Sequence, residues 1–540
     1  MKSKYLIASA LGMLTAASLT GCYDMDTLPY SQNVTEQQKG QAVEANPEMA
    51  QASITGITSL FSVFENIFSE RDDTDYGFPS VMLYMESRGI DLVADLTGYN
   101  WYQYSSALFD CRVNDPATEL TWGTCYNQIF GANAALKSIS ADTEDSELQF
   151  YRAQALAIRA YDYFTLAQTY QFTYVGNEDK PCVMLITEEN EAEVAANGIG
   201  RASVRDTYEQ IMKDLNEAIV LIEASELKPS DVLDSQPKRF LSAAAIYGLR
   251  ARVNLVMNNW DEAATDAQDA IDSFSGAPSS LAAAKGPGFA SLDETNWMWG
   301  IAIAETDRVV TNLICNWPSH MGSLNDGYAT AGAWRRVNKA LYNYIPESDV
   351  RKTWFLDGEG FSAGLTEAQQ AFITNANPDP YTQVKFAPYQ GVLGTPINAN
   401  DVPLMRIEEM HYILAEAQAM GSAGPGAGAQ TLINFVKSYR DPEYAFAGGS
   451  AEDVQNEIWM QRRVEFWGEG LATFDLMRLK KPFDRRGGGW NTTLVYNVQP
   501  NDPVLLLCIP QSEVNGNKAF TQAENNQPQS RPKSVADIED

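Results

Sequence analysis

The chain has 540 residues, of which 45% are hydrophobic and 11% aromatic, enough to fill a large buried core. Its 39 Lys and Arg residues stand against 70 Asp and Glu residues, which gives a formal net charge of −31. Proteins that bind nucleic acids or lie on anionic lipid need a basic face, so a surface this acidic argues against both functions.

The N-terminus has the features of an export signal. Two lysines precede an uncharged run over residues 5–19, which is shorter than the roughly 20 residues needed to span a bilayer and has the proportions of a secretory signal peptide. The run ends in Leu-Thr-Gly-Cys, which resembles the bacterial lipobox, a motif whose Cys is acylated and becomes the first mature residue.

We therefore expect residues 1–21 to be removed and Cys22 to carry an acyl chain such as palmitate, which anchors the protein to a membrane. Residues 22–46 are expected to be a tether. An ordinary secretory signal with an incidental Cys is the alternative. Two aspartates just after Cys22 resemble the acidic tags that send some lipoproteins to the cell surface.

After the tether, apolar residues recur at the spacing of α-helices. The segments with this period are 121–139, 151–170, 204–223, 242–273 and 403–420. The fourth is expected to break into two helices at Asn258-Asn259. Small and aromatic residues such as Ala160 and Phe164 recur as in tetratricopeptide helix pairs, where small residues let two helix backbones approach. Between about 275 and 400 this rhythm fails, which predicts loops with short strands, and a Gly-rich stretch at 421–428 predicts another loop.

Beyond Cys22 the chain has five cysteines and two histidines: Cys111, Cys125, Cys182, Cys315, Cys508, His320 and His411. An odd number of cysteines this far apart is not a disulfide framework. Cys111 and Cys125 could pair, but a free buried thiol is favoured because Cys125 lies in a helical pattern. No CxxC or His-x-x-x-His spacing is present, so the sequence predicts no zinc site, no Cys–His catalytic centre and no cofactor. A single structural Ca²⁺ stays open.

Six charged residues alternate in sign near the end of the helical region: Arg462, Arg463, Glu465, Glu469, Asp475 and Arg478. Glu465 and Glu469 are four residues apart, so they project side by side from one helix. The two carboxylates of a glycosidase must instead flank the scissile bond from opposite sides. The pattern therefore favours ion pairs that join helices over a catalytic acid and base.

The sequence GYNWYQY at 98–104 gathers four aromatic residues within six positions. On a strand, Tyr99 and Trp101 would share one face and Tyr102 and Tyr104 would share the other, so one pair could pack while the other meets a ligand. Sugars present apolar C–H faces and polar rims, which suit exposed rings with polar neighbours. The alternative is that these rings fill the core, where aromatic residues usually lie.

Other residues are candidates to complete such a site. Trp317 and Trp334 lie in the irregular region, and one of them is expected to face the 98–104 rings. Asn100, Arg88 and Asp95 are candidate hydrogen-bonding neighbours of a bound sugar.

Several segments together resemble the SusD/RagB family of outer-membrane nutrient-binding lipoproteins. They follow the family's order along nearly the whole chain: YGFPSVMLYMESRGIDLV at 76–93, TGYNWYQY at 97–104, RAQALAIRAYDYFTLAQTYQ at 152–171, PLMRIEEMHYILAEA at 403–417, IWMQRRVEFWGEGLATFDLMRLKK at 458–481 and LLLCIPQSEVNGN at 505–517. The block at 458–481 is the most specific. Departures are small: Gln461 stands where an acid is usual, Phe466 replaces a Leu, and Cys508 precedes Ile-Pro.

The resemblance implies a mainly α-helical fold, in which a right-handed superhelix of tetratricopeptide-like helix pairs packs against an irregular, loop-rich half. Residues 47–540 then form a single SusD-like domain. Its helical repeats occupy mainly 47–274 and 400–482, its loop-rich ligand-binding insertion about 275–399, and its C-terminal segment 483–540.

The resemblance also implies a function. Such proteins lie lipid-anchored on the cell surface as the lid of a TonB-dependent outer-membrane transporter of the SusC type. They hold an oligosaccharide or, in some branches, a peptide, and are not enzymes. Family members carry ligand-stacking aromatics in the loop equivalent to 97–104, which favours Trp101 as the main contact with Tyr99 or Tyr102 beside it. Outside the family, a helical-repeat scaffold that binds protein partners is the alternative.

Overall fold

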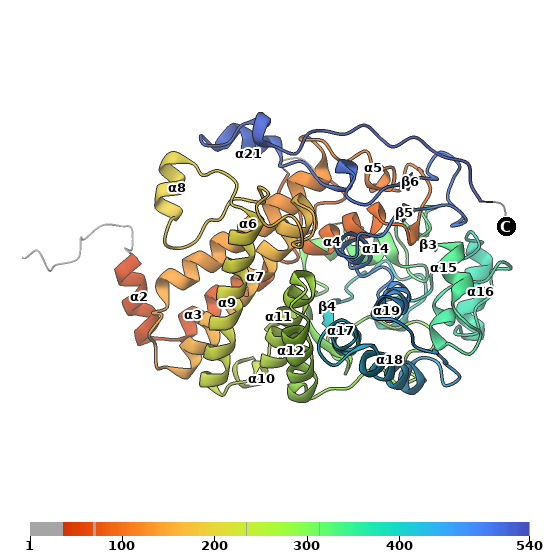
Figure 1. Cartoon of the computed structure of the whole chain (residues 1–540), viewed down its shortest axis with the longest axis horizontal. Helices are drawn as coiled ribbons and strands as arrows, with labels where there is room; N and C mark the ends of the chain where they lie inside the picture. Colours follow the sequence, from red (N-terminus) through yellow and green to blue (C-terminus); the bar gives the residue numbers. More distant parts are fainter. Residues whose placement is uncertain (1–35, 69–71, 234, 313, 539–540) are drawn as a thin grey trace, which may run out of the picture.

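The computed structural model describes residues 36–68, 72–233, 235–312 and 314–538 (Figure 1). The predicted signal peptide, the predicted lipidation site Cys22 and the first part of the predicted tether lie outside these residues. No helix in the described ranges is long and apolar enough to cross a membrane.

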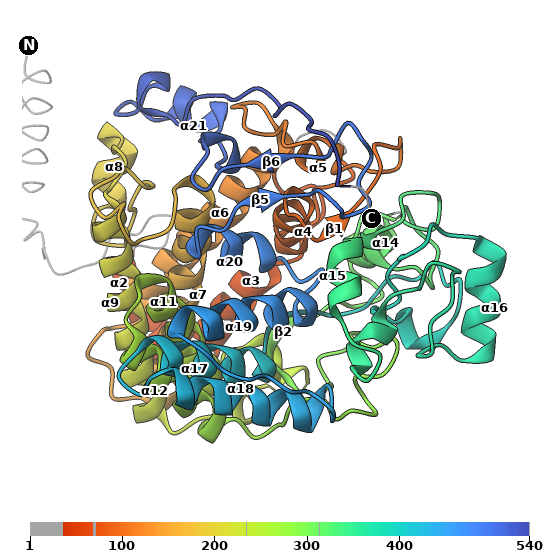
Figure 2. The ribbon, with the colours of Figure 1, turned by 45° about the vertical axis from the view of Figure 1, so that its right-hand side comes forward.

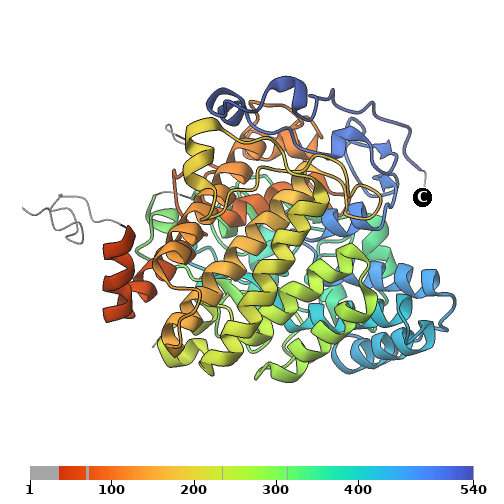
Figure 3. The ribbon, with the colours of Figure 1, turned by 60° about the vertical axis from the view of Figure 1, so that its left-hand side comes forward.

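One half of the molecule is an array of helices that follow one another in space much as they do along the chain (Figures 1 and 3). Helix α7 packs between α6 and α9, α11 packs on α12, and α17 packs between α12 and α18. This stacking of successive helices confirms the mainly helical fold. The helices are α2 Glu36–Ala45, α3 Glu48–Ser59, α4 Phe78–Arg88, α5 Gln103–Ser106, α6 Pro116–Ser138, α7 Ser146–Tyr170, α8 Glu191–Asn197, α9 Val204–Ser225, α10 Pro229–Val232, α11 Ala243–Met257, α12 Trp260–Ser273, α17 Ile407–Met420, α18 Pro425–Tyr439, α19 Ala451–Glu465 and α20 Ala472–Arg478.

Polar residues set the ends of these helices. The side chains of Asp145 and Ser203 accept backbone N–H groups at the starts of α7 and α9, which satisfies donors that the first turn leaves open. Asn258 adopts the left-handed conformation, with φ of 60°, and so separates α11 from α12 at the predicted position. The Gly-rich stretch 421–428 was expected to be a loop throughout, but α18 already begins at Pro425, because proline suits the first helical position.

The other half carries short elements joined by long loops. It contains α13 Arg308–Thr311, α14 Trp317–Met321, α15 Lys339–Tyr344 and α16 Glu367–Ala376, with 3₁₀ turns η2 Val350–Trp354 and η3 Tyr389–Gly391. The turn η1 Pro237–Arg239 packs on α10, and the C-terminal segment carries η4 Pro503–Leu505, α21 Gln511–Gly516 and η5 Gln522–Glu524, with α21 beside α8 (Figures 1 and 2). Figures 1 and 2 place α15 and α16 on the side of the molecule opposite α8 and α9.

The described residues contain three antiparallel two-stranded sheets, of which the first two connect distant parts of the chain. Strand β1 Leu92–Val93 pairs with β3 Arg336–Val337, β2 Trp297–Ile301 with β4 Val402–Arg406, and β5 Phe483–Asp484 with β6 Asn497–Val498. The first pair joins the segment after α4 to the loop-rich half. The second lies fully buried and leads directly into α17.

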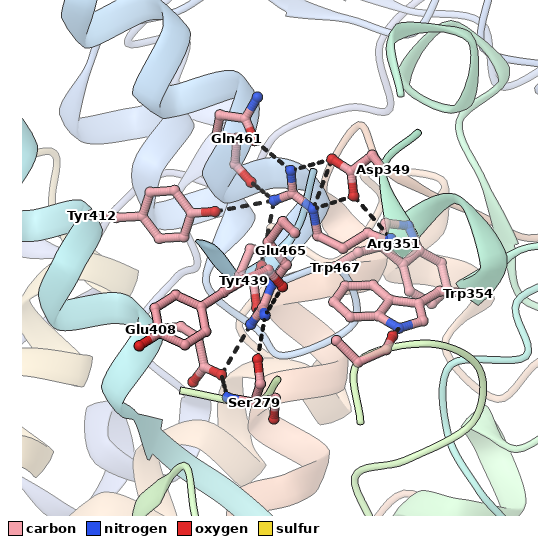
Figure 4. A network of polar contacts seen from close by, with 12 residues as sticks. Ser279, Asp349, Arg351, Trp354, Glu408, Tyr412, Tyr439, Gln461, Glu465 and Trp467 are labelled. Carbon is pink, nitrogen blue, oxygen red and sulfur yellow. Dashed lines mark hydrogen bonds and ion pairs between the residues drawn. The ribbon is translucent and has the colours of Figure 1, made fainter. Parts of the chain in front are cut away.

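Buried ion pairs hold the two halves together. Four cations and four carboxylates form one network whose formal charge is zero: Arg351, Lys385, Arg406, Arg440, Asp349, Glu408, Glu465 and Glu469. Glu465 of α19 lies at its centre and is completely buried. Its carboxylate is 2.7 Å from Arg440 Nε, 3.1 Å from Arg406 Nη1 and 3.4 Å from Arg351 Nη1; Figure 4 shows the approach of Arg351, from the loop-rich half.

Glu469 takes part in the same network, because its two oxygens lie 2.7 Å from Lys385 Nζ and 2.9 Å from Arg406 Nε. A second buried chain of ion pairs joins Arg462 to Asp475 and Arg478 to both Asp475 and Glu416. The alternating charges of 458–481 therefore join helices, as predicted. The two carboxylates do not project from one helix as expected, because α19 ends at Glu465 and Glu469 lies in the turn that follows. Both still contact one guanidinium, that of Arg406, instead of flanking an open site.

Candidate functional site

The predicted aromatic segment at 98–104 is a turn and not a strand. The N–H of Asn100 donates to the carbonyl of Thr97 at 3.0 Å, and the N–H of Gln103 donates to the carbonyl of Asn100 at 3.1 Å before α5 begins. Tyr99 and Trp101 are nevertheless both exposed, by 52% and 43%, while Tyr102 is buried. Tyr104, expected on the same side as Tyr102, is 49% exposed, which corrects that part of the expectation.

The two residues between them point inward, which corrects their assignment as ligand contacts. Asn100 is buried: its Nδ2 donates to the carbonyl of Asp95 at 2.9 Å, and its Oδ1 accepts from Arg335 Nη1 at 2.9 Å. Tyr102 is also buried, and its hydroxyl is hydrogen-bonded to the hydroxyls of Tyr76 and Ser80. The buried contacts of Asn100 and Tyr102 hold the backbone of the loop, while the rings of Tyr99 and Trp101 face solvent.

A stack of rings supports Trp101 from the protein side. The Trp101 ring meets Tyr328 edge-on with centroids 5.9 Å apart, and Tyr328 lies 4.8 Å from His320, which stacks on Tyr76. Burial, reinforced by the charge of Arg335, lowers the pKa of His320 to about 3, so the imidazole is neutral. Its Nε2 then donates to the carbonyl of Asp73 at 3.0 Å. The support is thus uncharged and fixed in orientation.

The two tryptophans expected opposite the loop have different surroundings. Trp317 is 4% exposed and packs edge-on against Phe386 with centroids 4.6 Å apart, so it belongs to the core and its assignment to the site is wrong. Trp334 is half-buried in the segment that leads from Tyr328 to β3. Its role in the site stays a prediction, supported by its position next to Arg335, which contacts Asn100 of the loop.

The two charged candidates also differ. Arg88, in α4, is buried, pairs with Asp110 at 2.8 Å and donates to the carbonyl of Val504, which makes its role structural and corrects the prediction. Asp95 keeps 40% of its side chain exposed and lies 3.0 Å from Arg336 Nη2. Asp95 therefore places a partly exposed carboxylate four residues before Tyr99, paired with the mostly buried Arg336.

Sequence reasoning missed one neighbour of the loop. The guanidinium of Arg112 lies over the rings of Tyr104, at 5.1 Å, and Phe109, at 4.0 Å, while it pairs with Asp115 at 2.7 Å. The side chain of Arg112 is 36% exposed. Arg112 reaches the Tyr104 ring because the chain turns back after α5, and no spacing in the sequence indicates this contact.

A separate cavity of about 70 Å³ lies between α4, α7, α11 and α20. One wall is apolar, with Phe78, Val81 and Phe164, and the other carries the ion-paired Arg252 and Arg462. None of the exposed rings of the 98–104 loop lines it. Among the described residues no group of three or more His, Cys, Asp or Glu side chains is placed to hold a metal ion.

Comparisons with known proteins agree with this architecture. A family model described as "Starch-binding associating with outer membrane" matches residues 83–255, and a model described as "SusD family" matches residues 357–526. No curated protein sequence matches the chain.

Solved structures match over most of the chain. A SusD-like carbohydrate-binding protein from Bacteroides vulgatus is 20% identical, with a TM-score of 0.71 over 88% of this chain and 97% of the other. A laminarin-binding SusD-like protein is 18% identical, with a TM-score of 0.58 over 88% and 98%. The surface glycan-binding protein A from Bacteroides thetaiotaomicron, solved with laminarihexaose, is 18% identical, with a TM-score of 0.62 over 88% and 99%. The two family models, which together match most of the chain, and this shared fold show that the chain belongs to the SusD/RagB family.

Proposed function

We propose that this protein is a non-catalytic glycan-binding lipoprotein of the cell surface, which captures an oligosaccharide and passes it to a TonB-dependent transporter in the outer membrane. The observation that carries the proposal is the loop 98–104, where Tyr99, Trp101 and Tyr104 are each at least 43% exposed although Asn100 and Tyr102 between them are buried. Large aromatic side chains are costly to leave in water, so three on one short loop indicate a surface that a ligand covers.

The chemistry around the loop suits a sugar. Exposed rings offer apolar faces to the C–H groups of a pyranose, and stacking of this kind does not need a cofactor. The ion pair of Asp95 and Arg336 and the guanidinium of Arg112 offer acceptors and donors for ring hydroxyls. Two structural relatives are described as binding laminarin or laminarihexaose, which makes β-glucans the first ligands to test.

Retention in gels that contain laminarin, starch, xylan or mannan, followed by calorimetry on the best ligand, tests the proposal. Trp101→Ala should weaken binding about tenfold, because a stacked ring of this exposure contributes on the order of 1–2 kcal/mol. Phe130→Ala is the matched control, since Phe130 is 42% exposed on α6 in the helical half.

The outcomes are distinct. Equal binding by both variants and the wild type would place the site elsewhere. Retention of no polysaccharide, with binding to peptides instead, would favour the peptide-binding branch of the family. Release of reducing ends from a bound glycan would contradict the non-catalytic assignment.

Membrane attachment and the transporter partner rest on the lipobox-like signal ending at Cys22 and on family membership. We propose that acylated Cys22 anchors the chain to the outer membrane with its globular part outside the cell. Cross-linking on intact cells, followed by purification, should recover a TonB-dependent barrel. Recovery of periplasmic proteins alone would instead favour the helical-scaffold alternative.

A further inference from the structure

Two cysteines that are far apart in the sequence meet inside the molecule. The Sγ atoms of Cys111 and Cys508 lie 3.9 Å apart, and both side chains are fully buried. The pairing of Cys111 with Cys125 that the sequence left open is not what the structure shows, because Cys125 lies buried within α6 beside Asp162. The contact therefore joins the segment after α5 to the C-terminal segment.

Backbone contacts on either side hold the two cysteines in place. The N–H of Gln529 donates to the carbonyl of Cys111 at 3.0 Å, and the N–H of Gln511 donates to the carbonyl of Val113 at 2.9 Å. The hydroxyl of Thr118, in α6, donates to the carbonyl of Cys508. Three lengths of chain are thus fixed to one another within a few residues of the sulfurs, and their contact does not depend on one mobile side chain.

The two thiols share a hydrogen bond that shifts their pKa values in opposite directions. The hydrogen bond with the Cys508 thiol holds the pKa of the Cys111 thiol below its ordinary value; burial opposes this effect and the guanidinium of Arg88 adds to it. The same hydrogen bond raises the pKa of Cys508. These pKa directions belong to the folded pair and show that the two sulfurs already contact each other there.

We propose that Cys111 and Cys508 form a structural disulfide that closes the chain between the segment after α5 and the C-terminal segment. A disulfide needs the two sulfurs about 2.05 Å apart, so side-chain rotation must bring them roughly 2 Å closer. The two backbones are already joined close to the cysteines, by the hydrogen bond between Gln511 and Val113. An exported protein meets conditions in which such a bond persists.

The oxidant is a disulfide, either of low molecular weight or in a thiol oxidoreductase. The Cys111 thiolate attacks one of its sulfurs, forms a mixed disulfide and releases the other sulfur as a thiolate. The Cys508 thiolate then attacks Cys111 Sγ, forms the intramolecular bond and releases the second thiolate. Two protons leave the cysteines and two thiols of the reduced oxidant result. Both cysteines are buried in the folded protein. The exchange therefore takes place during folding, before the C-terminal segment covers Cys111.

The test uses the full mature chain, refolded in a mixture of reduced and oxidised glutathione, alkylated with iodoacetamide and digested without reductant. We expect one cross-linked peptide that contains Cys111 and Cys508, an intact mass two hydrogens below that of the reduced chain, and alkylated Cys125, Cys182 and Cys315. The cross-link closes a loop of nearly 400 residues, so adding reductant should lower Tm by about 5 °C.

Two variants separate the proposal from chance oxidation. Cys508→Ala should leave Cys111 alkylated with no new cross-link, while Cys125→Ala should leave the cross-linked peptide unchanged. The wild-type peptide map alone decides the matter if a variant fails to fold. Recovery of Cys111 and Cys508 as alkylated thiols, or of either one bonded to a different cysteine, would overturn the proposal.

Discussion

Replacing Glu465 with Gln removes one negative charge from the centre of the buried network while it keeps the shape of the side chain. The wild-type network has four cations and four carboxylates, and Glu465 contacts three of the cations. In the variant, Arg351, Arg406 and Arg440 keep their charges with one carboxylate fewer. The interior of the protein would then hold a net positive charge that water cannot reach.

The loss in the free energy of unfolding follows from the three contacts of Glu465. At an effective dielectric constant near 20, charges about 4 Å apart attract by about 4 kcal/mol, and Glu465 makes three contacts of this kind. Part of this is returned because the variant no longer desolvates a carboxylate. Breaking a buried ion pair by removing one partner costs about 3–5 kcal/mol in measured cases, which we expect here. For a chain of this length that corresponds to a fall in Tm of about 3–5 °C.

Calorimetry and urea unfolding would measure the change, with Glu452→Gln as control because Glu452 is exposed near the start of the same helix α19. The control should lose less than about 1 kcal/mol. Adding Arg440→Met to Glu465→Gln restores charge balance, so the double variant should be more stable than the sum of the two single losses by about 1–3 kcal/mol. If Glu465→Gln unfolds like Glu452→Gln, the assignment of Glu465 as a structural charge is refuted.

Three further predictions concern other sites. The buried Asp162 carboxylate has the weak thiol donor of Cys125 as a hydrogen-bond partner, and burial raises its pKa, so its contribution is lost as pH rises above about 4. Asp162→Asn should stabilise the protein by about 1 kcal/mol or more at pH 7, and an advantage that did not shrink toward pH 4 in thermal melts would contradict this. Because the pKa of His320 is lowered to about 3, the folded state resists a proton that the unfolded state accepts near pH 6.5, and stability is lost as pH falls below that value. His320→Phe should therefore lose about 2 kcal/mol less than the wild type between pH 7 and pH 5 in urea unfolding, and equal losses would show that other groups dominate. Cys22→Ala should leave the protein unprocessed or in the soluble fraction; sedimentation with the outer membrane at the wild-type level would exclude acylation as the anchor.

The sequence predicted the parts of this fold that depend on neighbouring residues. The break at Asn258 follows from local backbone preference, and the ion pairs of Glu465 follow from the alternating charges at the end of α19. Glu469 lies in the turn beyond that helix, which the spacing alone did not predict. The sequence did not predict which rings of the candidate site face water, because their exposure depends on contacts between distant segments. Tyr102 is buried by Tyr76 and Ser80, more than twenty residues earlier, and no local pattern indicates this.

The same limit explains the other corrections. Trp317 opens a short helix in a loop-rich region, where exposure was a fair expectation, but Phe386 covers it from nearly seventy residues away. Arg88 is unavailable to a ligand because it pairs with Asp110 and donates to the carbonyl of Val504, both far from it in the sequence or in another segment. In each case the deciding contact joins residues that the sequence does not relate.

The separation between the exposed rings and the residues that hold their loop has a consequence for how such a protein adapts. Asn100, Tyr102 and Arg335 fix the backbone from inside, so Tyr99 and Trp101 contribute little to the frame that displays them. Under the proposed function, Tyr99 and Trp101 can therefore be exchanged without removing a contact that holds the loop. Changes in ligand preference and changes in stability would then arise at different residues of the same short loop.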